Sequence, residues 1–124
     1  MSKKIFITGT GTDVGKTFIA GLMIKKLNEN KKKSAFYKAA MSGNERGADG
    51  NLIPGDAVFV KTISGISQPL SEMCPYVYEA AVSPHLASRI EGNPIRMDIV
   101  RQGFDALCQK YDYVTMEGSG GILC

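Results

Sequence analysis

One stretch near the N-terminus constrains the fold of this chain more than any other. Residues 4–7 form a short apolar run that predicts a buried β-strand, and residues 8–17, TGTGTDVGKT, follow it directly. Beyond them, apolar side chains recur with helical spacing over residues 18–27. A strand, a glycine-rich turn, Gly-Lys-Thr and a helix are typical of a phosphate-binding loop, because the turn exposes backbone N–H groups at a helix N-terminus.

The length of this loop departs from the common pattern. Five residues separate Gly9 from Gly15, whereas four separate the matching glycines of the usual phosphate loop. One of the five is Asp13, and a carboxylate beside bound phosphates costs energy through like-charge repulsion. Two interpretations stay open: Asp13 faces a second, cationic substrate, or its side chain points into solvent or caps a turn.

The loop residues predict contacts with a nucleotide and its metal ion. Lys16 is expected to reach the β- and γ-phosphates, and the Thr17 hydroxyl is expected to ligate Mg²⁺. We therefore predict ATP as co-substrate and Mg²⁺ as cofactor. The residues expected to contact the nucleotide are Gly11, Thr12, Asp13, Val14, Gly15, Lys16, Thr17 and Glu117. The alternative is a plain glycine-rich turn between a strand and a helix.

Two further segments predict strands. Residues 34–39, SAFYKA, form the first, and residues 111–121 form the second, which runs into a glycine turn. Residues 41–55 are rich in Gly and Asn, which predicts a loop. In an open α/β sheet, ligands bind at the carboxyl ends of the strands. The glycine loop, Lys38 and Glu117 are therefore expected to converge on one crevice.

Three segments favour helices. Residues 83–92 begin with a Ser83 cap and a proline, and residues 97–111 show helical spacing of apolar side chains. Residues 56–64 fit a strand or a helix, but Asp56 as an N-cap favours the helix. The alternation predicts a single nucleotide-binding α/β domain over residues 1–124. We expect a parallel sheet flanked by helices in three α/β/α layers of the P-loop NTPase type.

Composition narrows the function classes. The chain has 124 residues and a net charge of +3, with much of the excess in residues 31–33, which we interpret as a solvated lysine turn after a helix. Nucleic-acid binding would need a basic stripe with interleaved aromatic residues, and the sequence shows none. Its apolar runs are also too short to predict a signal peptide or a membrane span. Three widely spaced cysteines without a Cys/His cluster fit reduced thiols, so a cytoplasmic protein is expected.

Five motifs stand out along the chain: GTGTDVGKT at residues 9–17, YKAAMSG at 37–43, GDA at 55–57, SPH at 83–85 and MEGSGG at 116–121. Together they resemble the dethiobiotin synthetase family. They occur in the order and spacing of that family, and the resemblance covers the whole chain. The five-residue spacing of the glycine loop is the family's own form.

The resemblance implies roles for individual residues. Lys16 and Lys38 match two lysines that face the carbamate and the transferring phosphate, so both are candidate catalytic residues. Thr17, Asp56 and Glu117 match three residues that share Mg²⁺. A hydroxyl and two carboxylates also suit that ion chemically, because Mg²⁺ prefers hard oxygen ligands.

The resemblance also implies the substrates and the reaction. Ser42 and Asp13 match positions near the diamine, so both are candidate substrate-binding residues. The family uses ATP and CO2 (or bicarbonate) to close the ureido ring of 7,8-diaminopelargonate, giving dethiobiotin, ADP and phosphate in biotin synthesis. Its members are homodimers, so a homodimer is expected. His85, the only histidine, is interpreted as a structural residue at a helix start rather than a base.

Two features depart from the family pattern. Ala39 stands where the family usually has proline, a mild loss of backbone restraint. The chain also stops at Cys124, whereas family members continue through strands and helices that hold the adenine site and part of the substrate-carboxylate site. We therefore expect an N-terminal portion, with its sheet truncated after the strand that ends at Glu117. Alone, it is expected to bind triphosphate weakly, to associate through its open sheet and to make no dethiobiotin.

Two other function classes stay open. A nucleotide-switch or partitioning ATPase of the same loop group would act by binding partners, and it typically carries a second lysine in the loop, where this chain has Asp13 and Val14. An inactive nucleotide-binding fragment is the other possibility. Phosphate release from ATP discriminates among them, because a carboxylase is nearly silent without its diamine and a switch ATPase ignores the diamine.

Overall fold

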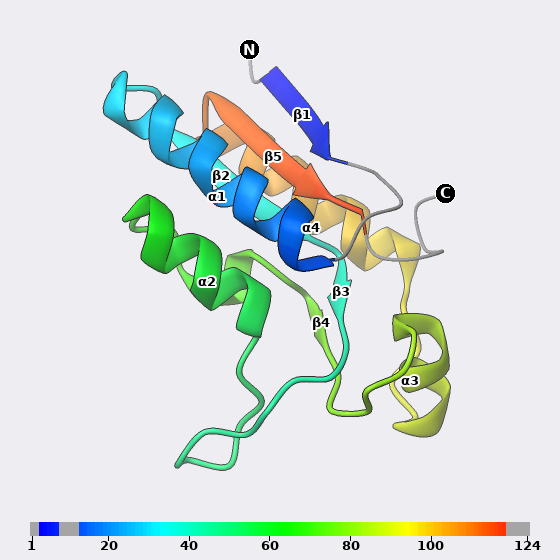
Figure 1. The fold of residues 1–124 in the computed structure, drawn as a ribbon. Helices are drawn as coiled ribbons and strands as arrows, with labels where there is room; N and C mark the ends of the chain where they lie inside the picture. Colours follow the sequence, from blue (N-terminus) through cyan, green and yellow to red (C-terminus); the bar gives the residue numbers. More distant parts are fainter. Residues whose placement is uncertain (1–2, 8–12, 119–124) are drawn as a thin grey trace.

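The computed structural model describes residues 3–7 and 13–118 and arranges them as a parallel sheet between helical layers (Figure 1). The elements in chain order are β1 Lys3–Ile7, α1 Asp13–Glu29, β2 Ser34–Lys38, β3 Ala40–Met41, α2 Gly55–Ser64, the 3₁₀ turn η1 Leu70–Glu72, β4 Tyr76–Val77, α3 Pro84–Ile90, α4 Met97–Lys110 and β5 Tyr113–Glu117. The predicted strands and helices are all present, whereas β3, β4 and η1 were not expected. The sequence predicted a loop over 41–55 and nothing for 69–82.

The central sheet has the strand order β1-β5-β2, and both pairings are parallel. Its register aligns the last residues of the three strands, because Ile7 pairs with Glu117 and Glu117 pairs with Lys38. The backbone N–H of Gly118 donates to the Ile7 carbonyl at 3.1 Å, which ties β1 to the residue after β5. The carboxyl ends of the strands therefore meet at one edge, as predicted. The short strands β3 and β4 form a second parallel pair.

Side chains alternate between the two faces of the sheet, and each face has its own cover. On one face, Phe36 lies in a buried cluster with residues of α1 and α2. On the other face, Tyr37 lies in a buried cluster with residues of α4. The three-layer α/β/α prediction is thereby confirmed (Figure 1). Lys38 follows Phe36 by two residues, so Lys38 and its register partner Glu117 lie on the face that α1 and α2 cover.

The predicted helices are present in the structure, but one of the two predicted N-cap residues is wrong. The 83–92 segment forms α3, with the Ser83 hydroxyl accepting a hydrogen bond from the Leu86 N–H at 3.3 Å, as the cap prediction requires. The ambiguous 56–64 segment is the helix α2, and Gly65 ends it in the left-handed region at φ 73°. The prediction that Asp56 is the N-cap is wrong. Pro54 holds that position, and the Asp56 carboxylate is drawn instead to Lys38.

The prediction that β1 is a buried strand is also wrong. Lys3, Lys4 and Phe6 are exposed, with Phe6 at 50%, and Ile5 and Ile7 are half-buried. Within the described residues, β1 pairs only with β5 and stands at the edge of the sheet. An apolar sequence indicates burial only when another layer or strand covers it. The described part of the chain provides that cover for β2 and β5 and leaves β1 open.

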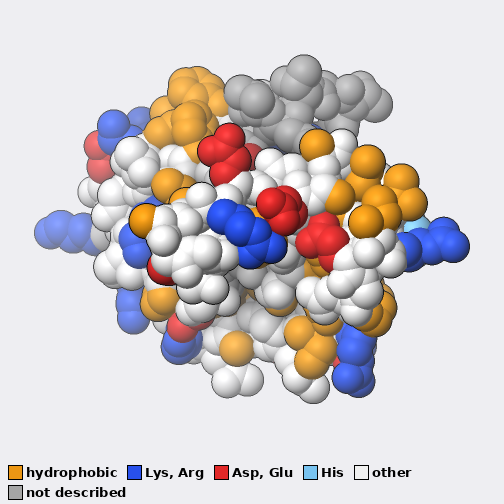
Figure 2. Space-filling model, turned by 90° about the horizontal axis from the view of Figure 1, so that it is seen from below, with side chains coloured by type: hydrophobic (Ala, Val, Ile, Leu, Met, Phe, Trp, Pro, Cys, Tyr) orange, Lys and Arg blue, Asp and Glu red, His pale blue; other side chains and the backbone are white. Residues whose placement is uncertain are grey.

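Apolar side chains are also exposed on the helices. The outer face of α1 carries Phe18, Ile19 and Leu22, each between 44% and 52% exposed. Figure 2 shows a second group of apolar side chains beside the histidine. Near that histidine in the chain, Leu86 and Ile90 of α3 are exposed. In the described residues, no helix combines the length and apolar character needed to cross a membrane.

The prediction of a solvated lysine turn is confirmed. Residues 31–33 are exposed in the turn after α1, and Lys31 adopts a positive φ of 62° there. Cys74 is buried and Cys108 is half-buried, and both are free thiols. Cys124 lies outside the described residues.

The contact between α4 and β2 yields the first prediction. A Cβ at Gly103 would lie 2.7 Å from the Tyr37 hydroxyl oxygen, which is held in place by donating to the Val100 carbonyl at 2.7 Å. Gly103→Ala should therefore lower the free energy of unfolding by about 1–3 kcal/mol, since overpacking outweighs helix propensity. At a helical position with room for a Cβ, a glycine-to-alanine change would instead raise the free energy of unfolding by up to about 1 kcal/mol. Urea unfolding followed by circular dichroism measures the difference.

A double-mutant cycle separates this clash from other effects of the substitution. Tyr37→Phe removes the hydroxyl oxygen, so Gly103→Ala should cost less in that background than in the wild type. Equal costs in the two backgrounds would show that the hydroxyl does not limit the packing of α4 on the sheet.

Candidate functional site

Four of the predicted site residues converge at the carboxyl edge of the sheet. Lys38 and Glu117 end the adjacent strands β2 and β5. Thr17 lies in the N-terminal part of α1, and Asp56 is the second residue of α2. Because both helices begin at this edge of the sheet, their N-termini bring a hydroxyl and a carboxylate to the two strand ends.

The Lys38 ammonium lies between two carboxylates. Its Nζ is 2.6 Å from Oδ2 of Asp56, to which it donates a hydrogen bond, and 2.7 Å from Oε2 of Glu117. The side chains of Lys38 and Glu117 are 5% and 0% exposed, whereas that of Asp56 is 35% exposed. The pairing with Glu117 is therefore shielded from water, and Asp56 connects the cluster to solvent.

The two oxygens of Glu117 are held differently. The Thr17 hydroxyl donates to Oε1 at 2.8 Å in a fully buried hydrogen bond. Oε2 is close enough to the Lys38 Nζ for an ion pair, but the angles do not meet hydrogen-bond geometry. Among the described residues, Oε2 thus has no hydrogen-bond partner although it is buried. The charge on this buried oxygen is compensated by the Lys38 ammonium, so the oxygen depends on a cation beside it.

The charges around Lys38 keep it protonated. Burial alone would lower the pKa of its ammonium, but the carboxylates of Glu117 and Asp56 act in the other direction and raise the pKa above its ordinary value. Lys38 therefore acts at this site as a fixed positive charge and not as a proton acceptor at neutral pH.

The structure describes only the last residues of the glycine loop, from Asp13 onward. Asp13, Val14, Gly15 and Lys16 form the start of α1 together with Thr17, so they stand where a helix N-terminus attracts anions. The predicted nucleotide contacts Gly11 and Thr12 lie outside the described residues. The open question about Asp13, whether its side chain faces a substrate or solvent, stays a prediction.

The donor set fits a magnesium ion. Thr17, Asp56 and Glu117 offer a hydroxyl and two carboxylates, which are the hard oxygens that Mg²⁺ prefers. The buried Oε2 of Glu117 supports the fit, because it is an acceptor without a hydrogen bond. No group of three or more His, Cys, Asp and Glu side chains in the described ranges could hold a metal by itself. The proposed site therefore depends on the threonine hydroxyl.

Two other predicted positions lie apart from this cluster. The Ser42 hydroxyl donates to the Val82 carbonyl at 2.5 Å, so in this structure it links the loop after β3 to the segment before α3. His85 is an exposed residue at the start of α3, and its interpretation as a structural residue stays a prediction.

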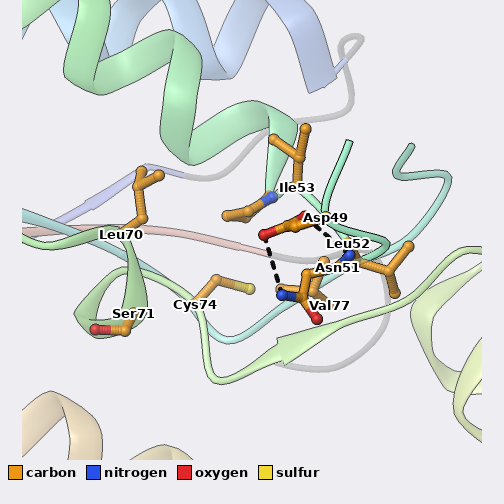
Figure 3. A pocket seen from close by; sticks show the side chains of 9 residues that line it. Asp49, Asn51, Leu52, Ile53, Leu70, Ser71, Cys74 and Val77 are labelled. Atoms are coloured by element: carbon orange, nitrogen blue, oxygen red, sulfur yellow. Dashed lines mark hydrogen bonds between the residues drawn. The ribbon is translucent and has the colours of Figure 1, made fainter. Parts of the chain in front are cut away.

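A hollow of about 360 Å³ lies beside the start of α2 (Figure 3). Its walls come from the loop before α2, from η1 and from β4, and they include Leu52, Ile53 and Val77. Cys74 lies at this hollow, and burial raises the pKa of its thiol to about 12. The thiol is therefore protonated at neutral pH and donates to the Tyr76 carbonyl, so it serves packing and not nucleophilic chemistry.

The sequence analysis did not predict the ion pairs that Lys38 forms with Asp56 and Glu117. The sequence predicted that Lys38 faces phosphate and that Asp56 and Glu117 face metal, but not that the lysine bridges these two carboxylates. A signal was available, because Lys38 and Glu117 each lie near the end of a predicted strand, and parallel strands that end together place the side chains at their ends side by side. The strand order, which makes β2 and β5 neighbours, was the missing information.

The comparisons with known proteins bear on this geometry. A family described as AAA domain matches residues 3–124. The chain belongs to that family. The parallel sheet flanked by helices is accordingly of the P-loop NTPase type, as predicted, and the family match describes it as an AAA domain.

Several curated relatives of this AAA domain chain carry the same name. The ATP-dependent dethiobiotin synthetase BioD of Clostridium novyi (strain NT) is 48% identical over 128 residues, covering 100% of this chain and 52% of the relative. The proteins of the same name from Clostridium botulinum strain ATCC 19397 and strain 657 are 47% and 48% identical over 124 residues, and each is covered over 54% of its length. The resemblance to dethiobiotin synthetase is confirmed. The chain spans about half the length of these relatives.

The buried ion pair generates the second prediction. Lys38→Met leaves Glu117 charged, buried and without its cation, so it should lower the free energy of unfolding by about 3–5 kcal/mol. Adding Glu117→Gln to Lys38→Met removes the uncompensated charge and should recover much of that loss. Urea unfolding of the complete protein, with and without each substitution, gives the coupling between the two residues.

An exposed ion pair provides the control. Lys110→Met breaks the contact of Lys110 with Glu72, whose atoms are 2.8 Å apart at the surface, and should leave stability almost unchanged. If Lys38→Met were as mild as Lys110→Met, the cluster would not depend on the lysine charge.

Proposed function

We propose that the complete protein containing this chain is an ATP- and Mg²⁺-dependent carboxylase that closes the ureido ring of 7,8-diaminopelargonate to give dethiobiotin. The observation that carries the proposal is the buried cluster of Thr17, Lys38, Asp56 and Glu117 at the end of the phosphate-loop strand and its neighbours. Relatives of this chain named ATP-dependent dethiobiotin synthetase support the same reaction.

The residues of the chain divide the work of binding ATP. Backbone N–H groups from Gly11 to Thr17 are proposed to surround the phosphates, with Lys16 at the β- and γ-phosphates. Thr17, Asp56 and Glu117 are proposed to hold Mg²⁺ through their oxygens. When bound there, the ion would neutralise charge on the phosphate oxygens during phosphoryl transfer.

The proposed reaction has three chemical steps. One amine of the diamine adds to CO2 and loses a proton, giving a carbamate. A carbamate oxygen attacks the γ-phosphorus of ATP, and ADP leaves. The second amine then attacks the carbonyl carbon of this mixed anhydride, closing the ring with loss of a proton and of phosphate. Negative charge builds near the phosphates at each stage, so fixed cations are the expected stabilisers.

Lys38 and Lys16 are proposed to supply those cations. The raised pKa of Lys38 supports this assignment, because a permanently charged ammonium stabilises an anionic transition state without transferring a proton. The position of Lys16 in the first turn of α1 supports its role at the phosphates. No covalent enzyme intermediate is required by these steps.

Two residues of the chain are candidates for contact with the diamine. Asp13 stands at the start of α1, where a carboxylate would attract a cationic amine, and Ser42 lies in the loop after β3. We propose both as substrate contacts, in a cytoplasmic homodimer whose partner surface lies near the diamine. The length of the relatives supports a further share of the site outside residues 1–124.

Product formation tests the function directly. The complete protein is incubated with diamine, bicarbonate, ATP and Mg²⁺, and dethiobiotin is measured by mass spectrometry. We expect product that depends on all four components, with almost no phosphate release when the diamine is omitted. Lys16→Ala should weaken ATP binding and abolish product while the protein stays folded. The 124-residue chain alone is expected to make none.

Two results of this assay would contradict the proposed function or the expected inactivity of the 124-residue chain. Steady ATP hydrolysis that ignores the diamine would indicate a switch or partitioning ATPase. Product from a verified 124-residue chain would show that the rest of the relatives' length is dispensable for the reaction.

Steady-state kinetics test the role of Lys38. Lys38→Ala should lower kcat by about 10²–10³, the effect of removing one preorganised charge or donor, while the KM for ATP changes much less. Lys61→Ala is a suitable control, because Lys61 is a partly buried lysine of α2 that donates to the Gln68 carbonyl and contacts no site residue in the described set. An effect confined to KM would make Lys38 a binding residue.

A further inference from the structure

We infer that Lys38 is the resident cation of the metal site: it holds Asp56 and Glu117 before Mg²⁺ arrives, and the metal releases it for the substrate. The inference rests on the proposed function, since it takes Asp56 and Glu117 as Mg²⁺ ligands. It adds a coupling that the metal-ligand assignment does not contain, because metal binding and the availability of Lys38 become one event.

The first observation is the place of the ammonium. Nζ lies 2.6 Å from an oxygen of Asp56 and 2.7 Å from an oxygen of Glu117, and these are the two carboxylates proposed to bind the ion. One cation touching both carboxylates occupies the position between them. A divalent ion that binds the same two oxygens therefore competes with the ammonium for one place.

The second observation is the kind of contact. Glu117 uses Oε1 to accept from the Thr17 hydroxyl, whereas Oε2 meets Lys38 as an ion pair without hydrogen-bond geometry. A contact that is mainly electrostatic depends on charge and less on direction. Another cation can therefore replace the ammonium at Oε2, and the directed hydrogen bond that the exchange breaks is the one from Lys38 to the half-exposed Asp56 carboxylate.

The third observation is the burial of the cluster. Lys38 is 4% exposed and Glu117 is 0% exposed, so water cannot compensate either charge. Without any cation, the buried Glu117 carboxylate would be left uncompensated beside the partly exposed carboxylate of Asp56, which costs free energy. The lysine stabilises the site in the absence of metal and the metal can take over that role, so the folded site is preserved in both states.

The exchange has a consequence for catalysis. While the ammonium pairs with both carboxylates, it is not available to a carbamate or a phosphate. Once a metal ion binds Asp56 and Glu117, Lys38 is free to turn toward the substrate. The charge that stabilises phosphoryl transfer is then supplied only when the metal is in place.

Metal binding without nucleotide tests the inference. Mn²⁺ is titrated into the complete, nucleotide-free protein, and free Mn²⁺ is measured by electron paramagnetic resonance. If Lys38 fills the site in nine of ten molecules or more, Lys38→Met should tighten Mn²⁺ binding by about tenfold or more. Lys61→Met, which removes a lysine of α2 outside the cluster, should leave the affinity unchanged.

The outcomes separate this inference from the proposed function. If Glu117→Gln abolishes Mn²⁺ binding but Lys38→Met leaves it equal or weaker, the metal site stands and the resident-cation inference is overturned. If Glu117→Gln leaves Mn²⁺ binding unchanged, the proposed metal site and the inference both fail. Tighter binding in Lys38→Met alone supports the exchange.

A measurement on the unsubstituted protein covers the case in which Lys38→Met does not fold. The ammonium of Lys38, held by two buried carboxylates, should give a slowly exchanging ¹⁵Nζ signal in nuclear magnetic resonance. Saturating Mg²⁺ should shift or remove that signal, whereas Na⁺ at equal ionic strength should not. A signal unchanged at saturating Mg²⁺ would overturn the inference.

Discussion

The placement of one buried ammonium organises the functional edge of this protein. Lys38 lies within 2.7 Å of carboxylate oxygens from both Asp56 and Glu117, and it thereby connects the ends of two strands to the start of α2. The Thr17 hydroxyl adds α1 to the same cluster through Glu117. Because charges buried this deeply must be compensated, the four elements cannot separate without exposing or isolating a charge.

Parallel pairing is what allows so compact a cluster. In the register of this sheet, Lys38, Glu117 and Ile7 stand side by side, each as the last residue of its strand. Side-chain alternation then directs Lys38 and Glu117 to the face covered by α1 and α2, while Tyr37 and Met116 join the core under α4. The same alternation that fills two hydrophobic layers thus separates the charged site from the packing on the other face.

Most of the elements were predictable from local patterns, since glycine loops, proline caps and helical periodicity act over a few residues. The Ser83 cap and the left-handed Gly65 are examples of such local signals. The two errors, the buried β1 and the Asp56 cap, have a common origin. Both concern a side chain whose surroundings come from a distant part of the chain: Phe6 is left 50% exposed at the sheet edge of the described residues, and Asp56 pairs with Lys38 instead of its own backbone.

The sequence by itself determined the family, the α/β class and the residue types at the site, because motif spacing and periodicity are written along the chain. Only the tertiary structure decided that β5 lies between β1 and β2. That order makes Glu117 the neighbour of Lys38, and so it decides which charges meet. Ion pairing depends on distances of a few ångströms between residues separated by tens of positions, and no local pattern encodes those distances.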